Sequence, residues 1–314
     1  MSGKNVPLIL PADDAGIAEA VQRLVAGEPV GVPTETVYGL AARADTDAAV
    51  AAIYRAKGRP DFNPLIVHCR DLAHAAELAA FDDRAERLAA AFWPGPLTMV
   101  LPLRDDSGLA PAVTASLPTV ALRVPAHPIM QTVLRASGLA LAAPSANASG
   151  AISPTRAEHV ARSLTGRIGA VLDGGPSGRG LESTIVALRD EGGWSLLREG
   201  PISRDALCAF LGEHPLPPSE AIEAPGQLIR HYAPGKPMRL NVSEAHPEEF
   251  MIGFGPVTGH TNLSESGDPI AAAARLYACL HEAAASALPR IAVAPIPDDG
   301  VGAAINDRLR RAAA

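Results

Sequence analysis

The chain reads Lys57-Gly58-Arg59-Pro60 and continues, after four residues, as Leu65-Ile66-Val67-His68-Cys69. Gly58 is a typical helix stop and Pro60 cannot extend a helix, so the first quartet predicts a helix that ends near Lys57. The apolar quintet that follows predicts a buried strand. A helix that leads directly into a buried strand indicates a protein in which helices pack on a sheet.

This alternation of helix and strand extends along the whole chain. Capped, apolar-periodic segments predict helices at 17–25, 46–57, 127–136, 155–164, 203–212 and 268–287, with others starting at 71, 82 and 301. Short apolar runs between turn residues predict strands at 29–33, 65–69, 98–103, 119–124, 139–143, 170–172, 183–188, 194–198, 250–254 and 290–294. Some strands follow one another directly, as in a hairpin. We therefore expect an α/β or mixed α+β fold whose sheet has mixed strand directions.

The composition changes at Glu213, where prolines become frequent. Because proline fixes φ and removes a hydrogen-bond donor, regular structure is not expected there. The predicted units are a first domain over 1–212, a Pro-rich linker over 213–237 and a small C-terminal α/β domain over 238–314. The strand–helix–strand–helix order after the linker predicts a Rossmann-like βαβ unit.

The overall composition argues against several classes of protein. A net charge of −7 disfavours a protein that coats nucleic acid by bulk charge, although it leaves room for local basic patches. No apolar run is long enough for a signal sequence or a membrane-spanning helix, so no membrane association is expected. The widely spaced Cys69, Cys208 and Cys279 fit a reducing compartment without structural zinc. We expect a cytoplasmic protein.

Five polar or charged side chains gather around the helix-to-strand connection. Arg55, Lys57 and Arg59 lie at the end of the predicted helix, where cations also complement the helix dipole. Asn63 and His68 lie in or beside a run that is otherwise apolar. A lone histidine in a strand is more often a core residue than a functional one. Five such groups within fourteen residues nevertheless favour a binding site.

An arginine interrupts the predicted strand at 119–124. Period-two alternation places Thr119, Ala121 and Arg123 on one face of that strand. A buried guanidinium needs an anion, which can be a structural carboxylate or the carboxylate of a ligand. We favour a ligand, because arginine holds a carboxylate through two parallel hydrogen bonds.

Hydroxyl and amide side chains follow other predicted strands. Thr36 lies in the turn after the strand at 29–33, and Ser145 and Asn147 follow the strand at 139–143. Local hydrogen bonding or helix capping explains such turns, and so does a small polar ligand that they surround. The Gly-rich loop at 174–180 is interpreted as a flexible connection, with phosphate binding as the alternative.

Several well-known catalytic motifs are absent from the sequence. It contains no Gly-x-Ser-x-Gly turn, no His-Glu-x-x-His helix, no paired-cysteine zinc pattern and no Gly-x-x-x-x-Gly-Lys-Ser/Thr phosphate loop. The candidate residues therefore suit a chemistry in which the substrates react with each other. The protein would then contribute positioning and charge stabilisation around an anionic ligand such as a nucleotide.

Five motifs, in this order and spacing, carry a resemblance to a known family. They are Pro-Thr-Glu-Thr-Val-Tyr-Gly-Leu (33–40), Lys-Gly-Arg-Pro (57–60), Ala-Leu-Arg-Val-Pro (121–125), Pro-Ser-Ala-Asn (144–147) and Glu-Ser-Thr-Ile-Val (182–186). Together they resemble the YrdC-type L-threonylcarbamoyladenylate synthases over roughly residues 10–212. The run Ala-Pro-Gly-Gln-Leu-Ile-Arg-His-Tyr-Ala-Pro (224–234) resembles the linker of the long, two-domain members.

The resemblance implies a reaction, its partners and a fold. L-threonine, bicarbonate or carbon dioxide, and ATP would give threonylcarbamoyl-AMP and pyrophosphate, with Mg²⁺ held mainly by the phosphates of ATP. The adenylate would pass to the tRNA threonylcarbamoyl-transfer machinery, which forms threonylcarbamoyladenosine in tRNA. Weak binding of tRNA itself is a further expectation. The implied fold is a twisted, open mixed sheet with helices around a deep concave site.

The resemblance also implies a role for individual residues. Those expected to bind L-threonine are Thr36, His68, Arg123, Ala143 and Ser183. Those expected to bind ATP are Lys57, Arg59, Asn63, Thr119, Ser145, Asn147, Ser153, Arg198 and Tyr232. Ala143 would act through its main chain, because the family often has Thr or Ser at that position. Arg123 would bind the threonine carboxylate, and Tyr232 would cover the nucleotide as part of a mobile linker.

Two other functions are kept as alternatives. One is a non-catalytic module that binds double-stranded RNA or tRNA in the same positive concavity, which the acidic net charge and the aromatic content of 4% weaken. The other is a related carbamoyl-adenylating enzyme that acts on a different carbamate. Release of pyrophosphate that requires threonine would separate the three functions.

Overall fold

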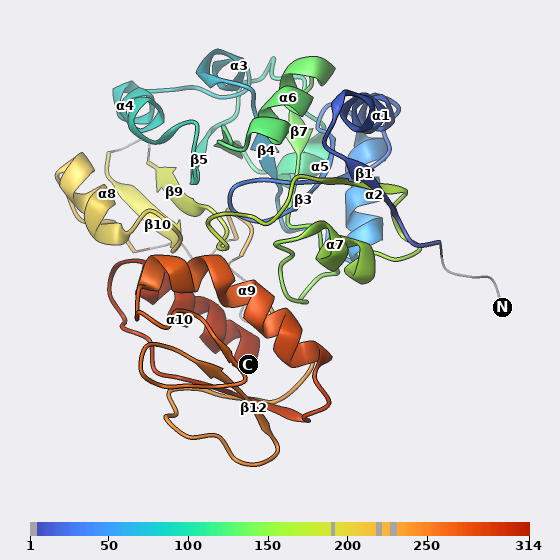
Figure 1. Ribbon diagram of the computed structural model, residues 1–314. Helices are drawn as coiled ribbons and strands as arrows, with labels where there is room; N and C mark the ends of the chain where they lie inside the picture. Colours follow the sequence, from blue (N-terminus) through green and yellow to red (C-terminus); the bar gives the residue numbers. More distant parts are fainter. Residues whose placement is uncertain (1–4, 190–191, 218–221, 227–230) are drawn as a thin grey trace.

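The computed structural model describes residues 5–189, 192–217, 222–226 and 231–314. It contains two sheets, one on each side of the predicted linker in the sequence (Figure 1). The linker and the turn between the strands predicted at 183–188 and 194–198 lie partly outside the described residues. The exact domain limits at 212 and 237 stay a prediction.

The large sheet has ten strands, in the order β1-β8-β2-β3-β7-β4-β6-β5-β9-β10 across the sheet. In chain order they are β1 (Leu8–Pro11), β2 (Val30–Val32), β3 (Gly39–Arg43), β4 (Ile66–His68), β5 (Leu97–Pro102), β6 (Thr119–Arg123), β7 (Leu141–Ala142), β8 (Ala170–Asp173), β9 (Thr184–Leu188) and β10 (Trp194–Arg198). Parallel pairs such as β4 with β6 occur beside antiparallel pairs such as β9 with β10. The prediction of a mixed sheet is therefore confirmed.

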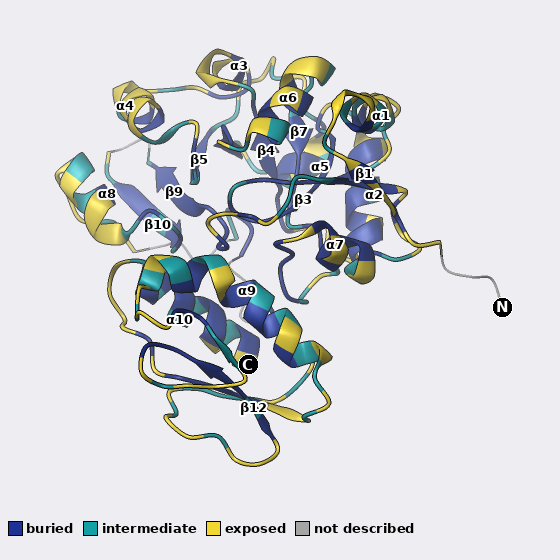
Figure 2. Ribbon diagram, in the orientation of Figure 1, coloured by how far each residue is buried: buried dark blue, intermediate teal, exposed yellow. Residues whose placement is uncertain are grey.

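Helices surround this sheet. They are α1 (Asp14–Val25), α2 (Asp47–Lys57), α3 (Leu72–Ala76), α4 (Asp83–Phe92), α5 (Pro111–Thr114), α6 (Pro128–Ser137), α7 (Ala157–Ser163) and α8 (Arg204–Leu211). Asp13 and Ser203 accept hydrogen bonds from the first turns of α1 and α8, and Gly58 ends α2 with a φ of +61°. Figure 2 shows the exposed residues of α1, α3, α4 and α6 on their outer sides.

The two faces of the large sheet are covered unequally. One face packs against residues of α2, α3, α4, α5, α7 and α8. The other face packs against α1 and α6, but only over β1, β8, β2, β3 and β7. Over the remaining strands, the buried side chains of that face contact the linker residue Ala224 instead of a helix. We call this part of the sheet, which includes Ile66, Ala121 and Ile185, the half-open face; its residue Ile66 lines a concave site.

Two strands of the large sheet differ from the prediction. β3 has the sequence Gly-Leu-Ala-Ala-Arg, which contains no β-branched or aromatic residue. It becomes a strand because it pairs with β2 on one side and β7 on the other, and this tertiary pairing outweighs its weak propensity. β1 ends in Pro11 and was not predicted as a strand. It lies at the edge of the sheet, where a proline is tolerated.

The C-terminal part folds around a second, parallel sheet of order β11-β14-β12-β13. Its elements are β11 (Met238–Arg239), β12 (Glu249–Gly253), β13 (Thr261–Asn262), α9 (Pro269–Ala285), β14 (Arg290–Val293) and α10 (Gly300–Ala313). The parallel pair of β12 and β14, connected through α9, confirms the predicted βαβ unit. Figure 1 shows α9 and α10 between the small sheet and the large sheet. Within the described ranges, no helix combines the length and the apolar character needed to cross a membrane.

Candidate active site

The half-open face of the large sheet carries a polar cavity with a volume of about 50 Å³. Its walls come from the large-sheet part of the chain, between Thr34 and Arg198, and from the linker. The predicted site residues that line it are Thr36, Arg59, His68, Arg123, Ala143, Ser145, Ser183, Arg198 and Tyr232. The structure therefore brings together residues from all five motifs that carried the resemblance and from the linker run.

His68 and Arg123 end two neighbouring parallel strands, where they are direct partners. Burial of His68, assisted by the positive charge of Arg123, lowers the pKa of His68 to about 3. The ring is therefore neutral at pH 7. Its buried Nδ1 has no hydrogen-bond partner among the described residues. A neutral imidazole with a free ring nitrogen can make one directed hydrogen bond to a ligand in the cavity.

Arg123 already holds an anion that belongs to the protein. Its Nη2 lies 2.5 Å from Oε1 of Glu35, and its Nη1 donates to the hydroxyl of Thr36 at 2.9 Å. Burial would raise the pKa of Glu35, but the charge and hydrogen bond of Arg123 lower it overall. In this structure the anion beside Arg123 is therefore a structural carboxylate, that of Glu35. From the sequence we had favoured the carboxylate of a ligand. A ligand carboxylate has to share Arg123 with Glu35 or displace it.

Ser183 precedes β9 and Arg198 ends β10, and the antiparallel pairing of these strands brings them together. Arg198 donates through Nε to the main-chain oxygen of Ser183 at 2.9 Å and through Nη2 to its hydroxyl at 3.0 Å. The Ser183 hydroxyl is also 2.7 Å from the hydroxyl of Thr98. Both site residues are therefore held in place, and Arg198 offers a fixed positive charge to an anionic ligand.

A third arginine of the cavity, Arg59, follows the C-terminus of α2. Its guanidinium donates to the main-chain oxygens of Asn63 and Pro64 at 3.3 and 3.1 Å. Burial lowers the pKa of Arg59 to about 10, so the side chain is charged at pH 7. Asn63 itself does not line the cavity. Its buried Oδ1 has no hydrogen-bond partner among the described residues.

Lys57 connects the two segments that the sequence singled out. Its ammonium donates to the main-chain oxygens of Ser145 and Asn147 at 2.5 and 2.7 Å. Lys57 is buried and does not line the cavity, and its burial lowers the pKa of the ammonium well below the usual value. Asn147 also lies outside the cavity lining and donates to Ala151. Lys57 therefore anchors the loop after β7.

Two more predicted ATP residues lie outside the cavity lining. Ser153 is fully buried, and its hydroxyl donates to Oε1 of Glu182 at 2.5 Å. Glu182 does line the cavity. Thr119 begins β6, whose other end carries Arg123, so their α-carbons lie about 13 Å apart along the strand.

Residues of the linker form the part of the cavity lining that lies over the sheet. Tyr232 is only 1% exposed, and its ring packs at 4.2 Å from the ring of His231. The adjacent Ala233 donates from its main-chain nitrogen to Gly150 at 2.8 Å. Burial also lowers the pKa of His231 to about 3, so this ring is neutral at pH 7.

The residues expected to bind L-threonine or ATP do not include nine that line the cavity: Thr34, Val37, Gly39, Ile66, Pro144, Glu182, Pro225, Gly226 and His231. Most of them belong to the motifs that carried the resemblance, so the motifs themselves were the available signal. Ile66 gave no such signal, because in the sequence an apolar strand residue that lines a cavity looks the same as one in the core.

The cavity offers no ready-made metal site. No group of three or more His, Cys, Asp or Glu side chains in the described part of the chain could hold a metal ion. The carboxylates at the cavity are already paired, Glu35 with Arg123 and Glu182 with Arg308. A metal that enters bound to the phosphates of a nucleotide fits this set of residues, and one held by a protein cage does not.

Comparisons with known proteins cover both parts of the chain. The Sua5–YciO–YrdC family model, described as "Telomere recombination", matches residues 22–200. A second model, described as "Threonylcarbamoyl-AMP synthase, C-terminal domain", matches residues 202–314. The two models together account for nearly the whole sequence.

Individual relatives give the same result. The threonylcarbamoyl-AMP synthase of Bacillus subtilis is 40% identical over 97% of this chain and 94% of its own length. That of Pyrococcus abyssi is 37% identical over 91% of this chain and 90% of its own. The crystal structure of P. abyssi Sua5 complexed with L-threonine is similar with a TM-score of 0.88 and 31% identity, over 98% of each chain. The chain therefore belongs to the threonylcarbamoyl-AMP synthase family, in its two-domain form.

Proposed function

We propose that this protein is an L-threonylcarbamoyladenylate synthase, which converts L-threonine, bicarbonate or carbon dioxide, and ATP to threonylcarbamoyl-AMP and pyrophosphate. The observation that carries the proposal is the cavity, where three arginines, two neutral histidines and several hydroxyls come together over one half of the sheet. Relatives over nearly the whole length of the chain carry the name of this enzyme.

The part of the cavity near β4 and β6 suits the amino acid. Arg123 would bind the carboxylate of threonine, in competition with Glu35. Neutral His68 and the hydroxyl of Ser183 would bind its polar groups, and Ala143 can offer only its main chain. The P. abyssi protein of similar structure was solved with L-threonine.

The arginines Arg59 and Arg198 suit the phosphates of ATP. The amine of threonine would attack the carbon of carbon dioxide with loss of a proton, or that of bicarbonate with loss of water, to give a carbamate. An oxygen of this carbamate would then attack the α-phosphorus of ATP. Pyrophosphate then leaves, and the arginines would stabilise the negative charge that grows on it. Mg²⁺ bound to the phosphates would neutralise part of the same charge.

The other predicted ATP residues would act less directly. Ser145 lines the cavity, whereas Lys57 and Asn147 fix the loop that carries it. Ser153, Asn63 and Thr119 lie outside the lining in this structure, so ATP would reach them only after a rearrangement of the cavity.

The linker would act as a lid. The cavity volume of about 50 Å³ is far below the roughly 300–1,000 Å³ of small-molecule sites, so ATP and threonine cannot occupy it in this closed form. Tyr232 and His231 form its cover, and their movement would admit the substrates. Closure over the bound substrates would exclude water from a hydrolysable intermediate.

The product would pass to the tRNA threonylcarbamoyl-transfer machinery. Three free thiols are consistent with a reaction in the cytoplasm, where cysteines stay reduced. Direct binding of tRNA is a secondary proposal, supported only by the arginines of the cavity. An RNA-binding module without catalysis would require that RNA, and not ATP, occupies the cavity.

The test is release of pyrophosphate from ATP and bicarbonate in the presence of each amino acid. We expect release that requires L-threonine, together with a product of the mass of threonylcarbamoyl-AMP. Release with another amino acid instead would indicate a related carbamoyl-adenylating enzyme. No release with any amino acid, together with tight binding of tRNA, would overturn the proposal in favour of the RNA-binding alternative.

A further inference from the structure

Glu182 occupies a central position in the cavity wall. Its Oε1 accepts the hydrogen bond of Ser153, and the next residue in the chain, Ser183, is held by Arg198. Ser153 and Ser183 are the predicted contacts of the two substrates. The Glu182 carboxylate is therefore connected to one residue predicted for each substrate.

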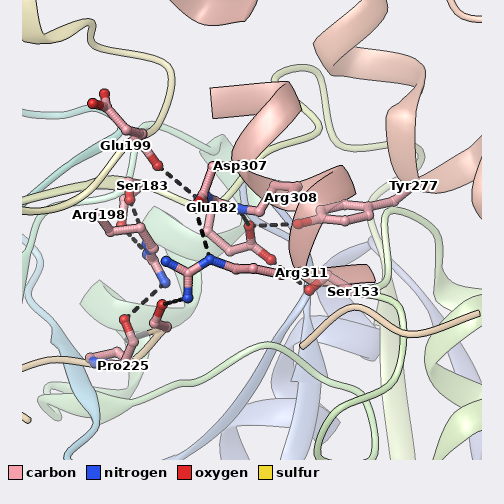
Figure 3. Close-up of polar contacts among 11 residues, drawn as sticks. Ser153, Glu182, Ser183, Arg198, Glu199, Pro225, Tyr277, Asp307, Arg308 and Arg311 are labelled. Atoms are coloured by element: carbon pink, nitrogen blue, oxygen red, sulfur yellow. Dashed lines mark hydrogen bonds and ion pairs between the residues drawn. The ribbon is translucent and has the colours of Figure 1, made fainter. Parts of the chain in front are cut away.

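Within the described residues, the donors to the second oxygen of this carboxylate come from the C-terminal part of the chain. Oε2 of Glu182 accepts hydrogen bonds from the hydroxyl of Tyr277 on α9 at 2.8 Å and from Nε of Arg308 on α10 at 2.9 Å. Figure 3 shows Tyr277 and Arg308 converging on Glu182 from the C-terminal helices. The two parts of the chain thus meet at the cavity wall.

This contact is buried on both sides. The side chain of Arg308 is 0% exposed and that of Glu182 is 7% exposed. Burial alone would raise the pKa of Glu182, but the charges of Arg308 and Arg198, with hydrogen bonds from Ser153 and Arg308, lower it to about 2. The carboxylate is therefore ionised at neutral pH and depends on its cationic partners.

Helix α10 also contacts the cover of the cavity. The guanidinium of Arg308 lies 5.3 Å from the centre of the Tyr232 ring, and its Nη2 donates to the main-chain oxygen of Glu199 at 2.8 Å. One turn away, Arg311 donates to the main-chain oxygen of Gly226 at 2.6 Å. The same helix therefore contacts the wall, the linker and the cover.

We propose that Arg308 and Tyr277 are positioning residues that complete the substrate cavity from the C-terminal domain. They hold Glu182 so that its other oxygen orients Ser153 and its neighbour Ser183 stays against Arg198. Arg308 also neutralises a carboxylate that would otherwise repel anionic substrates. This inference rests on the proposed function, since it assigns a role in binding the substrates of that reaction.

The buried charge of Glu182 allows a direct test of the role of Arg308. In Arg308→Met the buried carboxylate of Glu182 loses one of its cations and faces the triphosphate. We expect the KM and the Kd for ATP to rise at least about tenfold, because loss of one partner of a buried ion pair is costly to the other. In Glu182→Gln/Arg308→Met the neutral amide needs no cation, so both constants should return to within about threefold of wild type. Arg310→Ala is the matched control, on the same helix with a side chain 60% exposed.

Two measurements keep a role in binding separate from a role in folding. Thermal melts report the folded fraction, and KM and calorimetric Kd values for ATP are taken on folded protein only. Tyr277→Phe removes a single hydroxyl and serves as the second variant where Arg308→Met does not fold. We expect it to raise the KM for ATP by a factor of about three to ten, the effect of losing an ordinary hydrogen bond, because Arg308 still binds the same oxygen of Glu182.

The outcomes differ for the two proposals. Wild-type constants in folded Arg308→Met or Tyr277→Phe, or no recovery in the double variant, would overturn the inference while the enzyme remains a synthase. A wild-type protein without threonine-dependent turnover would contradict the proposed function instead. The Kd for ATP would still test the positioning role in that protein.

Discussion

The ammonium of Lys57 is hydrogen-bonded to the main-chain oxygen of Ser145, 88 residues further along the chain. It also binds the main-chain oxygen of Asn147. This contact fixes the end of α2 to the loop after β7 at the edge of the cavity. The role of Lys57 in this structure is that of an anchor, because its side chain does not line the cavity.

Replacement of Lys57 by methionine should therefore loosen the Ser145 loop. The two main-chain oxygens would lose a buried donor, so the free energy of unfolding should fall by about 1–3 kcal/mol. The KM for ATP should rise several-fold more than the KM for threonine. Urea unfolding and steady-state kinetics measure both effects, with the exposed Arg55→Ala of the same helix as the control. Wild-type stability with lost turnover would instead indicate direct contact with the phosphates.

Replacement of Arg59 by alanine tests the cation that does line the cavity. We expect the KM for ATP to rise at least about tenfold, because a charge-assisted hydrogen bond to phosphate contributes about 1.5–3 kcal/mol. The melting temperature should change little, since Arg59 is only partly buried and its protein partners are main-chain oxygens. Unchanged kinetics in folded Arg59→Ala would show that this arginine does not bind ATP.

Gly226→Ala should displace Arg198 from its position against Ser183. A Cβ at Gly226 would lie 2.9 Å from Cδ of Arg198, and the φ of +90° is itself unfavourable for alanine. Gly235→Ala is the matched control, because Gly235 also has a positive φ, of +76°, but has nothing within 4 Å of its Cβ position. We expect a larger KM for ATP in Gly226→Ala than in Gly235→Ala. Equal kinetics in the two variants would show that the position of Arg198 does not limit binding.

Burial of His68 predicts a pH dependence of stability. Its pKa is lowered from 6.5 to about 3 in the folded protein, so below pH 6.5 the unfolded chain binds a proton that the folded chain does not. The free energy of unfolding should therefore fall by up to about 1.4 kcal/mol per pH unit for this residue as the pH decreases from 6.5 towards 3. Urea unfolding at pH 7, 6 and 5 measures the slope, which should be smaller in His68→Gln. The same slope in both proteins would contradict a neutral, buried His68.

Most of the helices and strands could be predicted from the sequence, because helix caps and apolar periodicity are local features of a sequence. Gly58 and Ser203 end and begin helices where the sequence placed those boundaries. Strand β3 was missed because only its neighbours make it a strand. Local signals cannot reveal a strand whose residues have low β-propensity.

The residues of the site could be predicted from the sequence only in part, for a related reason. His68 and Arg123 were singled out because polar residues in apolar strands are unusual. The sequence led us to favour a ligand carboxylate for Arg123, whereas the structure pairs it with Glu35, because a sequence cannot tell a structural carboxylate from that of a ligand. The contact of Glu182 with Arg308 joins residues 126 positions apart, and no local pattern connects them.

That separation has a consequence for the timing of synthesis. Because a ribosome adds Arg308 after Glu182, the intervening 126 residues take roughly 6–25 s to make at usual elongation rates. During that interval the nascent large sheet can form with the Glu182 carboxylate still lacking its partner. Docking of α10 completes this contact, so we expect a nascent chain that has not yet reached α10 to hold nucleotide poorly and release little reactive adenylate.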